Sequence, residues 1–208
     1  RWTDHDGQPI WIDCRGTIIS EGDKPLYLFG CINEIGAVQK ADNVSGLLGE
    51  SSLKSYIQQL LPKLPNGFLL RIGLDDFKKI NEKLGTDYGD RILKQTADDI
   101  SSCILPGQKI YRVQSDEFIV LDFAGGTEAI AIDLYKRIRS FISKFVADNH
   151  YEAVFTISAG LLTSENIIQH TYSDIMKYSD FSLNEAKRQG KNLCYIFQQA
   201  DYDKFCRR

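Results

Sequence analysis

The sequence predicts an α+β fold in which helices flank a central antiparallel sheet on the split βαβ plan. Three observations predict it. From Gly67 onward, buried apolar runs and helical stripes follow the order strand, helix, helix, strand, strand, helix, strand, helix, strand. Gly and Pro residues separate these segments. Two of the strands are joined by one short acidic turn, which is typical of a hairpin.

Residues 1–36 precede this pattern and contain strand candidates but no helical stripe. A few strands without a helix make a poor independent core. We therefore expect this segment to be the C-terminal part of a larger sensory domain, followed by a linker at residues 37–50. The chain begins with Arg1 rather than Met, so we expect a piece of a longer protein. The expected elements are strands at residues 8–13 and 26–32, a bend at Arg15-Gly16 and a turn at residues 21–25.

The main domain is expected at residues 51–198, with residues 199–208 as a tail toward a possible downstream domain. Ser51 or Ser52 can cap its first helix, whose apolar stripe ends at Pro62. The later expected elements are, in order, a strand at residues 68–74, a helix around residues 77–84 capped by Asp75 or Asp76, a helix at 87–103, hairpin arms at 109–113 and 118–123, a helix at 127–145, a strand at 154–162, a helix at 173–188 and a strand at 193–197.

Composition excludes several classes of function. The chain has 208 residues, of which 43% are hydrophobic and 25% charged, and its net charge is -3. These hydrophobic and charged fractions are ordinary for a globular protein, and a net charge of -3 does not attract nucleic acid. No apolar run approaches the roughly 20 residues of a membrane-spanning helix. The five cysteines are scattered without a C-x-x-C pair, which favours reduced thiols and a cytoplasmic location.

Two acidic pairs stand where the expected strands end. Asp75-Asp76 follows the first strand of the main domain, and Asp116-Glu117 lies in the hairpin turn. If those strands are central neighbours, the carboxylates can hold a hard cation such as Mg²⁺ that bridges phosphates. The alternative is that Asp75 caps a helix while Asp116 and Glu117 are solvated turn residues.

Two lysines four residues apart provide a second signal. Lys187 and Lys191 lie at the end of the last expected helix. Their ammonium groups can meet a phosphate. Alternatively, they only complement the negative end of the helix dipole, and spacing alone leaves both interpretations open.

Five separated segments, taken together, resemble the motifs of GGDEF domains in the right order. The resemblance covers residues 41–198. Residues 1–36 resemble, more weakly, the last strands of a PAS domain through Arg15-Gly16, the turn at residues 22–25 and Gly30. The five segments are residues 42–47 (D-x-L-T-G-L), 73–90 (D-x-D-x-F-K-x-x-N-D…G…GD), 111–118 (the hairpin that names the family), 156–160 (T-x-S-x-G) and 179–192 (A-D-x-A-L-Y-x-A-K-x-x-G-R-N).

The resemblance implies a palm-like fold related to nucleotide cyclases and the condensation of two GTP molecules into cyclic di-GMP. Each domain of a homodimer would hold one GTP, with Mg²⁺ or Mn²⁺ at the phosphates, and the 3′-hydroxyl of one nucleotide would attack the α-phosphate of the other. Degenerate members of the family often precede an EAL phosphodiesterase domain. The resemblance implies no nucleic-acid partner.

Carried over residue by residue, the resemblance assigns most of a nucleotide site. Phe77 and Lys78 fall within the nucleotide-binding segment. Lys191 stands where the family has an arginine, which keeps the charge but loses the bidentate fork. The other assignments are Asn81 and Asp90 to guanine, Lys187 to phosphate, Asp116 to the metal and Glu117 to the acidic position beside it.

The departures affect catalysis. The first Asp of D-x-D, a metal ligand in the family, is Gly73 here. Asp75 matches the second Asp, and Asp76, one position further, is a possible substitute ligand. The two hairpin glycines are Gln114 and Ser115, which tolerate positive φ and close phosphate approach less well than glycine. The R-x-x-D motif of product inhibition is also missing, because its positions are Leu105 and Gln108.

These departures predict a degenerate GGDEF domain that is catalytically impaired and acts as a regulatory GTP-binding or dimerisation module. Two alternatives stay open. One is an active diguanylate cyclase in which Asp76 or a water molecule compensates for Gly73. The other is a purely structural dimerisation module that relays a PAS signal through packing.

Overall fold

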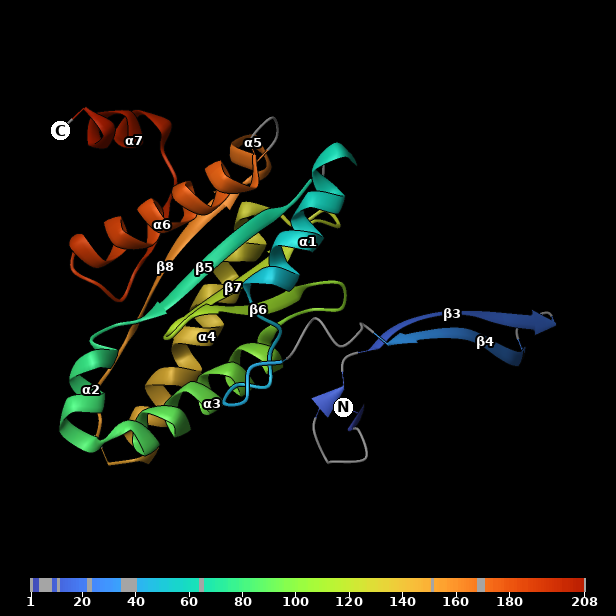
Figure 1. The fold of residues 1–208 in the computed structure, drawn as a ribbon, viewed down its shortest axis with the longest axis horizontal. Helices are drawn as coiled ribbons and strands as arrows, with labels where there is room; N and C mark the ends of the chain where they lie inside the picture. The colour runs from blue at the N-terminus through green and yellow to red at the C-terminus, as the bar shows by residue number, and fades with distance from the viewer. Residues whose placement is uncertain are drawn as a thin grey trace.

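In the computed structural model of the protein, the residues described are 2–3, 9–10, 12–21, 24–34, 41–63, 66–150, 152–167 and 171–207. A five-stranded sheet with the strand order β6-β7-β5-β8-β9 forms the centre of the main domain (Figure 1). Its elements follow the predicted order, with a short helix α5 as an unpredicted addition. They are β5 (Phe68–Leu74), α2 (Phe77–Leu84), α3 (Thr86–Cys103), β6 (Lys109–Gln114), β7 (Glu117–Asp122), α4 (Glu128–Asp148), β8 (Ile157–Thr163), α5 (Ser164–Ile167), α6 (Tyr172–Arg188) and β9 (Cys194–Ile196).

The central strand β5 lies between β7 and β8 and pairs antiparallel with both. The edge strand β9 runs parallel to β8, so the sheet that the sequence predicts as antiparallel is mixed. The α+β fold and the split βαβ order are confirmed. β5 and β7 are adjacent central strands. Asp75-Asp76 follows β5 and Asp116-Glu117 lies where β7 begins, so the two acidic pairs meet at the same end of the sheet.

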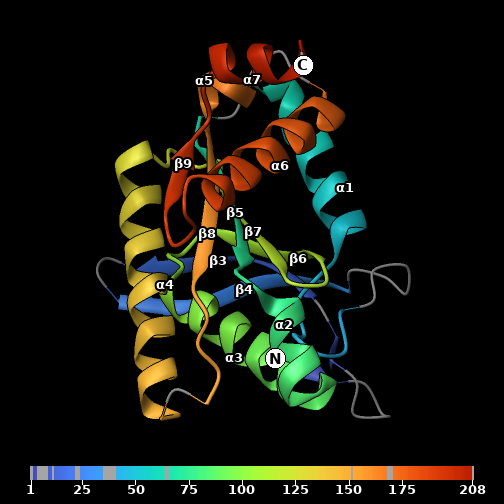
Figure 2. The ribbon, with the colours of Figure 1, turned by 90° about the vertical axis from the view of Figure 1, so that its left-hand side faces the viewer.

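Alternation along β5 separates two hydrophobic cores. Phe68, Leu70 and Ile72 point into the core that α2, α3 and α4 cover. Leu69 points into the other core, which α1 (Glu50–Leu60) and α6 cover. Figure 2 shows α4 on one side of the sheet and α1 with α6 on the other. Arg71 and Gly73 have the same parity as Leu69 and therefore face α6.

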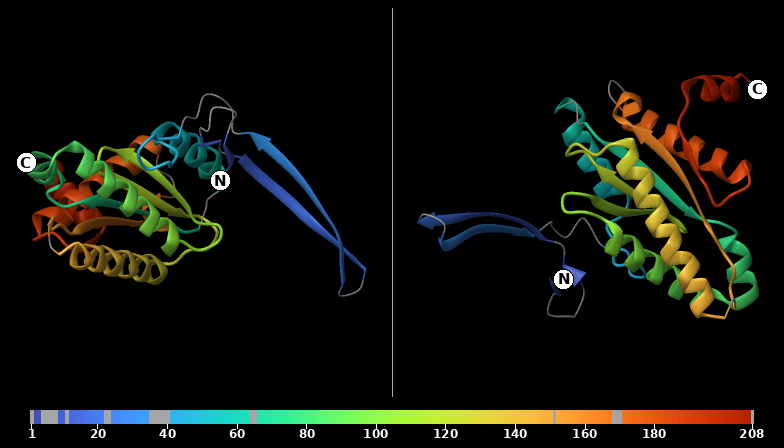
Figure 3. Two further views of the ribbon diagram at one scale, coloured as in Figure 1. Left: turned by 90° about the horizontal axis from the view of Figure 1, so that it is seen from below. Right: turned by 180° about the vertical axis from the view of Figure 1, so that it is seen from behind.

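The N-terminal strands form separate pairs. β1 (Trp2–Thr3) pairs with β2 (Pro9–Ile10), and β3 (Ile12–Glu21) pairs antiparallel with β4 (Lys24–Glu34). None of the four pairs with the five-stranded sheet (Figure 1, Figure 3). The predicted bend at Arg15-Gly16 is wrong, because β3 continues through it and Gly16 lies opposite Gly30 in the register. Residues 8 and 11, residues 22–23 and residues 37–40 of the predicted strand, turn and linker lie outside the described residues.

Helix starts also differ from the prediction. α1 begins at Glu50 with Gly49 in the N-cap position, so neither Ser51 nor Ser52 caps it. The expected tail contains a further helix, α7 (Gln199–Cys206). A 3-10 turn, Leu61–Lys63, follows α1. Within the described residues, no helix combines the length and apolarity needed to cross a bilayer.

Candidate functional site

The candidate site lies where β5 leaves the sheet beside the β6–β7 hairpin. Gly73 on β5 is directly opposite Glu117 on β7. The backbone N–H of Leu74 donates to the carbonyl oxygen of Asp116 at 3.2 Å. The predicted juxtaposition of the two acidic segments is therefore present, and Gly73 between them lies against Leu183 and Lys187 of α6.

Gly73 lies against a lysine of α6. A Cβ atom built on Gly73 would be 3.0 Å from Nζ of Lys187 and 3.1 Å from a methyl group of Leu183. Lys187 therefore extends over the position at which the resemblance expects a carboxylate. In the part of the chain that the structure describes, no carboxylate lies within ion-pair distance of the Lys187 ammonium.

Glu117 is held by an arginine that sequence reasoning missed. The side chain of Arg71 is 2% exposed. Its Nε and Nη2 atoms donate to Oε2 of Glu117 at 2.7 and 2.6 Å. Nη2 also reaches Oδ1 of Asp180 on α6 at 3.2 Å. A buried charge is tolerated only when it is paired and hydrogen-bonded, and Arg71 satisfies both conditions.

The hairpin turn contains Gln114 and Ser115 at the positions of the two family glycines, and its backbone is not strained there. Neither Gln114 nor Ser115 adopts a positive φ, although Gly is the residue that makes such angles easy. The hydroxyl of Ser115 donates to Oδ1 of Asp116 at 2.8 Å. Asp116 is partly exposed and makes no ion pair with any described residue.

Asp75 is a structural residue in this arrangement. Its carboxylate accepts hydrogen bonds from the hydroxyls of Thr156 at 2.6 Å and Ser158 at 2.8 Å. It also accepts from the backbone N–H of Asn192 at 3.2 Å. These bonds join the end of β5 to β8 and to the loop after α6, so the interpretation of Asp75 as a helix cap is wrong.

Asp76 occupies the N-cap position of α2 with a left-handed φ of 59°, yet its side chain makes no capping bond. Its carboxylate instead contacts Nζ of Lys191 at 2.6 Å and Nζ of Lys79 at 2.8 Å. Hydrogen bonds from Lys191 and then Lys79 lower the pKa of Asp76 to about 2. Lys191 therefore already has an anionic partner in the absence of phosphate.

The predicted guanine contacts lie where α2 meets α3. A Cβ on Gly89 would be 1.8 Å from Oδ1 of Asn81, so only glycine permits this approach. That buried oxygen has no hydrogen-bond partner among the described residues. Asp90 follows directly and is exposed, while Phe77 is buried and Lys78 pairs with Glu82 at 3.7 Å on the surface.

With this geometry established, comparison with known proteins decides the family. The sequence profile described as "Diguanylate cyclase, GGDEF domain" matches residues 39–193. The chain belongs to the GGDEF family. It is therefore similar to the diguanylate cyclase domains of cyclic di-GMP signalling.

Individual relatives agree with this assignment. The chain is 34% identical over 137 residues to the probable diguanylate cyclase DgcT of Escherichia coli, covering 64% of this chain and 29% of that protein. It is 31% identical to the diguanylate cyclase DgcS of Shewanella oneidensis over 69% of this chain and 46% of that protein. The chain thus spans less than half the length of either relative.

The GGDEF fold is shared with solved structures. The diguanylate cyclase SiaD of Pseudomonas aeruginosa, solved with its activator SiaC, superposes with a TM-score of 0.68 at 24% identity. The match covers 77% of this chain and 62% of that chain. At this level of identity, the comparison supports the fold alone.

The described side chains of this GGDEF domain do not fit a divalent metal ion. No three His, Cys, Asp or Glu residues among them converge as a ligand set. Gly73 contributes no oxygen, Glu117 is bound to Arg71, and Asp76 is bound to two lysines. Asp116 is the one predicted ligand whose carboxylate has no cationic partner in the described part of the chain.

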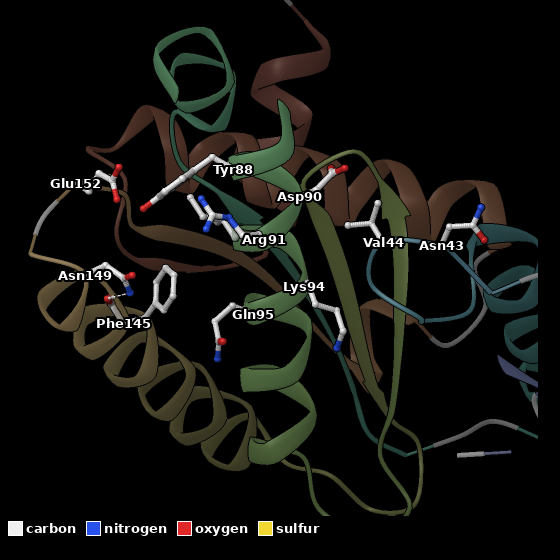
Figure 4. A pocket seen from close by; sticks show the side chains of 11 residues that line it. Asn43, Val44, Tyr88, Asp90, Arg91, Lys94, Gln95, Phe145, Asn149 and Glu152 are labelled. Atoms are coloured by element: carbon white, nitrogen blue, oxygen red, sulfur yellow. Dashed lines mark hydrogen bonds between the residues drawn. The ribbon is translucent and has the colours of Figure 1, made fainter. Parts of the chain in front are cut away.

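A hollow of about 640 Å³ lies elsewhere on the GGDEF domain, along α3 and the end of α4 (Figure 4). Of the residues that the resemblance assigns to nucleotide or metal, only Asp90 lines it. Asn81, Lys187 and Lys191 do not, so the hollow shares only Asp90 with the candidate site. The hollow is lined by Asn43, Val44, Tyr88, Asp90, Arg91, Ile92, Lys94, Gln95, Phe145, Asn149 and Glu152.

Arg71 is the functional candidate that sequence reasoning missed. The signal was present, because Arg71 is the one charged residue of an otherwise apolar strand. It lies two residues before Gly73 and so shares its face of the sheet. The partner on α6, Asp180, could not have been named without knowing where α6 crosses the strands.

Proposed function

We propose that this GGDEF domain is catalytically impaired and serves as a regulatory GTP-binding or dimerisation module in cyclic di-GMP signalling. The observation that carries the proposal is Gly73, which replaces a metal-binding carboxylate with no side chain at all. The ammonium group of Lys187 lies 3.0 Å from the Cβ position at Gly73. A cation at that distance disfavours a second cation beside it.

The hairpin supports the same proposal. Gln114 and Ser115 place side chains where two glycines would leave the backbone open to phosphate. The Ser115 hydroxyl is hydrogen-bonded to Asp116, the remaining predicted metal carboxylate. Misplacement of one reacting group by about 1 Å can reduce a rate by ~10²-fold. Here both the missing carboxylate at Gly73 and the two substituted hairpin glycines are expected to disturb the reacting groups.

Nucleotide binding is proposed to survive this loss. Asn81 offers a buried acceptor without a partner among the described residues, which suits the N–H donors of guanine. The ammonium of Lys187 has no carboxylate partner in the described part of the chain and can meet phosphate, whereas Lys191 must first leave Asp76 to do so. The proposed ligand is GTP or a related guanine nucleotide.

The linker supports a regulatory role. Asp42 accepts hydrogen bonds from the backbone N–H of Ser45 at 2.7 Å and from Nη1 of Arg112 at 2.5 Å. Burial opposes ionisation of Asp42, but these hydrogen bonds outweigh it and lower its pKa. The backbone N–H of Arg112, on β6, donates to Leu48 at 2.9 Å. A displacement of the linker by a preceding PAS domain would therefore reach the hairpin directly. The PAS remnant, a downstream EAL domain, a homodimer and a cytoplasmic location belong to this proposal.

Calorimetry combined with a product assay tests the proposal. We expect wild-type protein to bind GTP, Lys187→Met to bind it at least about tenfold more weakly through loss of one charge-assisted contact, and neither to make cyclic di-GMP detectable by chromatography. Lys177→Met, on the exposed side of α6, is the matched control and should bind as the wild type does. If no GTP binding were detected at millimolar concentration, the proposed nucleotide binding would be wrong and only the proposed dimerisation role would remain.

An active diguanylate cyclase is the second candidate, and one observation favours it. Asp116 has no cationic partner among the described residues, and Asp76 lies in the turn that follows β5. If the two carboxylates shared a Mg²⁺ or Mn²⁺ ion, wild-type protein would convert GTP into cyclic di-GMP. Asp76→Asn would then abolish turnover, whereas the impaired domain is expected to show none in either form.

A further inference from the structure

Arg71 introduces a permanent positive charge beside the phosphate end of the candidate site. Every residue of β5 is buried, and burying an unpaired guanidinium would cost several kcal/mol. Its Nη1 atom, which does not contact a carboxylate, lies 3.4 Å from both the carbonyl oxygen of Met176 and the hydroxyl of Ser179. All of its nitrogen atoms therefore have partners, so Arg71 is a fixed part of the fold and not a mobile ligand for phosphate.

The carboxylates that Arg71 neutralises lie beside Gly73, the position at which the family has a metal-binding carboxylate. Glu117 is opposite Gly73 in the strand register, and Arg71 is its diagonal neighbour on the same face. Asp180, on α6, is the second anion within ion-pair distance of Arg71. Lys187 extends over Gly73 on the same face, so two cations lie beside the carboxylates of Glu117 and Asp180, while Asp116 in the adjoining turn has no cationic partner among the described residues.

A divalent ion would therefore find only one carboxylate, that of Asp116, without a cationic partner among the described residues. To bind Glu117, Mg²⁺ would have to displace Arg71 and leave a guanidinium buried without a partner. A triphosphate, in contrast, meets the ammonium of Lys187, which has no carboxylate partner among the described residues, and that of Lys191, which can exchange Asp76 for phosphate. The unpartnered Oδ1 of Asn81 independently points to a ligand at the other end of the site.

We infer that Arg71 acts as an internal counter-ion that replaces the divalent metal, so that this domain binds its guanine nucleotide without Mg²⁺ or Mn²⁺. This inference rests on the proposed nucleotide binding and specifies its chemistry. Arg71 is a positioning residue here, because it acts through Glu117 and Asp180 and does not touch the nucleotide.

Titration of the wild-type protein with GTP, in excess EDTA and in excess Mg²⁺, tests the inference. We expect the two dissociation constants to agree within about threefold. An affinity about tenfold or more lower in EDTA would overturn the inference while leaving the proposed function intact. Absence of binding under both conditions would overturn both, so the two failures are distinguishable.

Two variants test the role of Arg71 itself. Arg71→Met leaves Glu117 and Asp180 without their cation, and we expect it to bind Mn²⁺ at least about tenfold more tightly than the wild type does, measured by calorimetry or by the paramagnetic signal of free Mn²⁺. Arg137→Met removes an arginine from α4, away from the site, and is the matched control. Unchanged Mn²⁺ affinity in folded Arg71→Met would overturn the counter-ion role.

If Arg71→Met does not fold, Glu117→Gln provides a second test of the same inference. The carboxamide retains an acceptor for Arg71 but removes one negative charge. If Glu117 is only the partner of Arg71, GTP affinity should rise or stay unchanged, equally in EDTA and in Mg²⁺. If Glu117 is a metal ligand, the affinity in Mg²⁺ should fall selectively, which would overturn the inference.

Discussion

Replacement of Arg71 by Met should be the most damaging single change at the site. The two side chains have similar length, but Met leaves the carboxylate of Glu117, whose side chain is 12% exposed, without its counter-charge. Removing one partner of a buried ion pair costs about 3–5 kcal/mol. For a domain of this size, a loss of that magnitude lowers the melting temperature by roughly 6–20 °C.

Urea unfolding followed by far-ultraviolet circular dichroism measures this loss. Arg71→Met/Glu117→Gln should recover part of it, on the order of 1–3 kcal/mol, because the double variant has no unpaired buried carboxylate at this position. Arg137→Met removes an ion pair with the exposed Asp133 and a hydrogen bond to the carbonyl oxygen of Cys103, and it should lose about 2 kcal/mol or less. A loss below about 1 kcal/mol in Arg71→Met would refute the argument that Arg71 is fixed by its buried pairing.

Three further changes have defined outcomes. Asp75→Ala should cost about 2–4 kcal/mol in urea unfolding, because it leaves buried hydroxyls such as that of Ser158 without an acceptor. Gly89→Ala should weaken GTP binding at least about tenfold in calorimetry, since the new methyl group displaces Asn81. Asp76 contributes stability that is present above its ordinary pKa of about 3.9 and is lost as the pH falls toward about 2. The difference in urea midpoint between Asp76→Asn and wild type should therefore shrink as the pH is lowered from 5 to 3, and a constant difference would contradict this assignment.

The sequence predicted the α+β fold and its element order correctly because local signals and tertiary packing agree in most of these elements. Along β5, every residue is buried and the breakers stand at its ends, so the strand was found with its correct bounds. The predicted start of α1 was wrong because a contact with a distant strand, and not a local capping residue, determines where the helix begins. The carbonyl oxygen of Leu48 is bound by Arg112 from a distant strand, which fixes the chain up to Gly49 and lets the helix begin one residue before Ser51.

The sequence predicted that the two acidic segments lie together, but it did not predict the partners of their carboxylates. Strand order brought Asp75 and Glu117 to the same end of the sheet, as expected. Their roles depend on partners from distant elements, which spacing along the chain does not reveal. The carboxylate of Asp75 accepts a hydrogen bond from Ser158 on β8, and that of Glu117 is paired with Arg71.

Helix α6 connects these observations. Asp180 and Lys187 are seven residues apart and therefore share one face of the helix, where one contacts Arg71 and the other lies over Gly73. Another face of α6 packs on α7, with the rings of Phe181 and Tyr202 at 5.2 Å between centroids. A phosphate that draws Lys187 away from Gly73 thus acts on the helix against which the C-terminal helix is packed. Because packed interfaces respond to small shifts by changing between discrete arrangements, we expect nucleotide binding at Lys187 to be coupled to the position of α7.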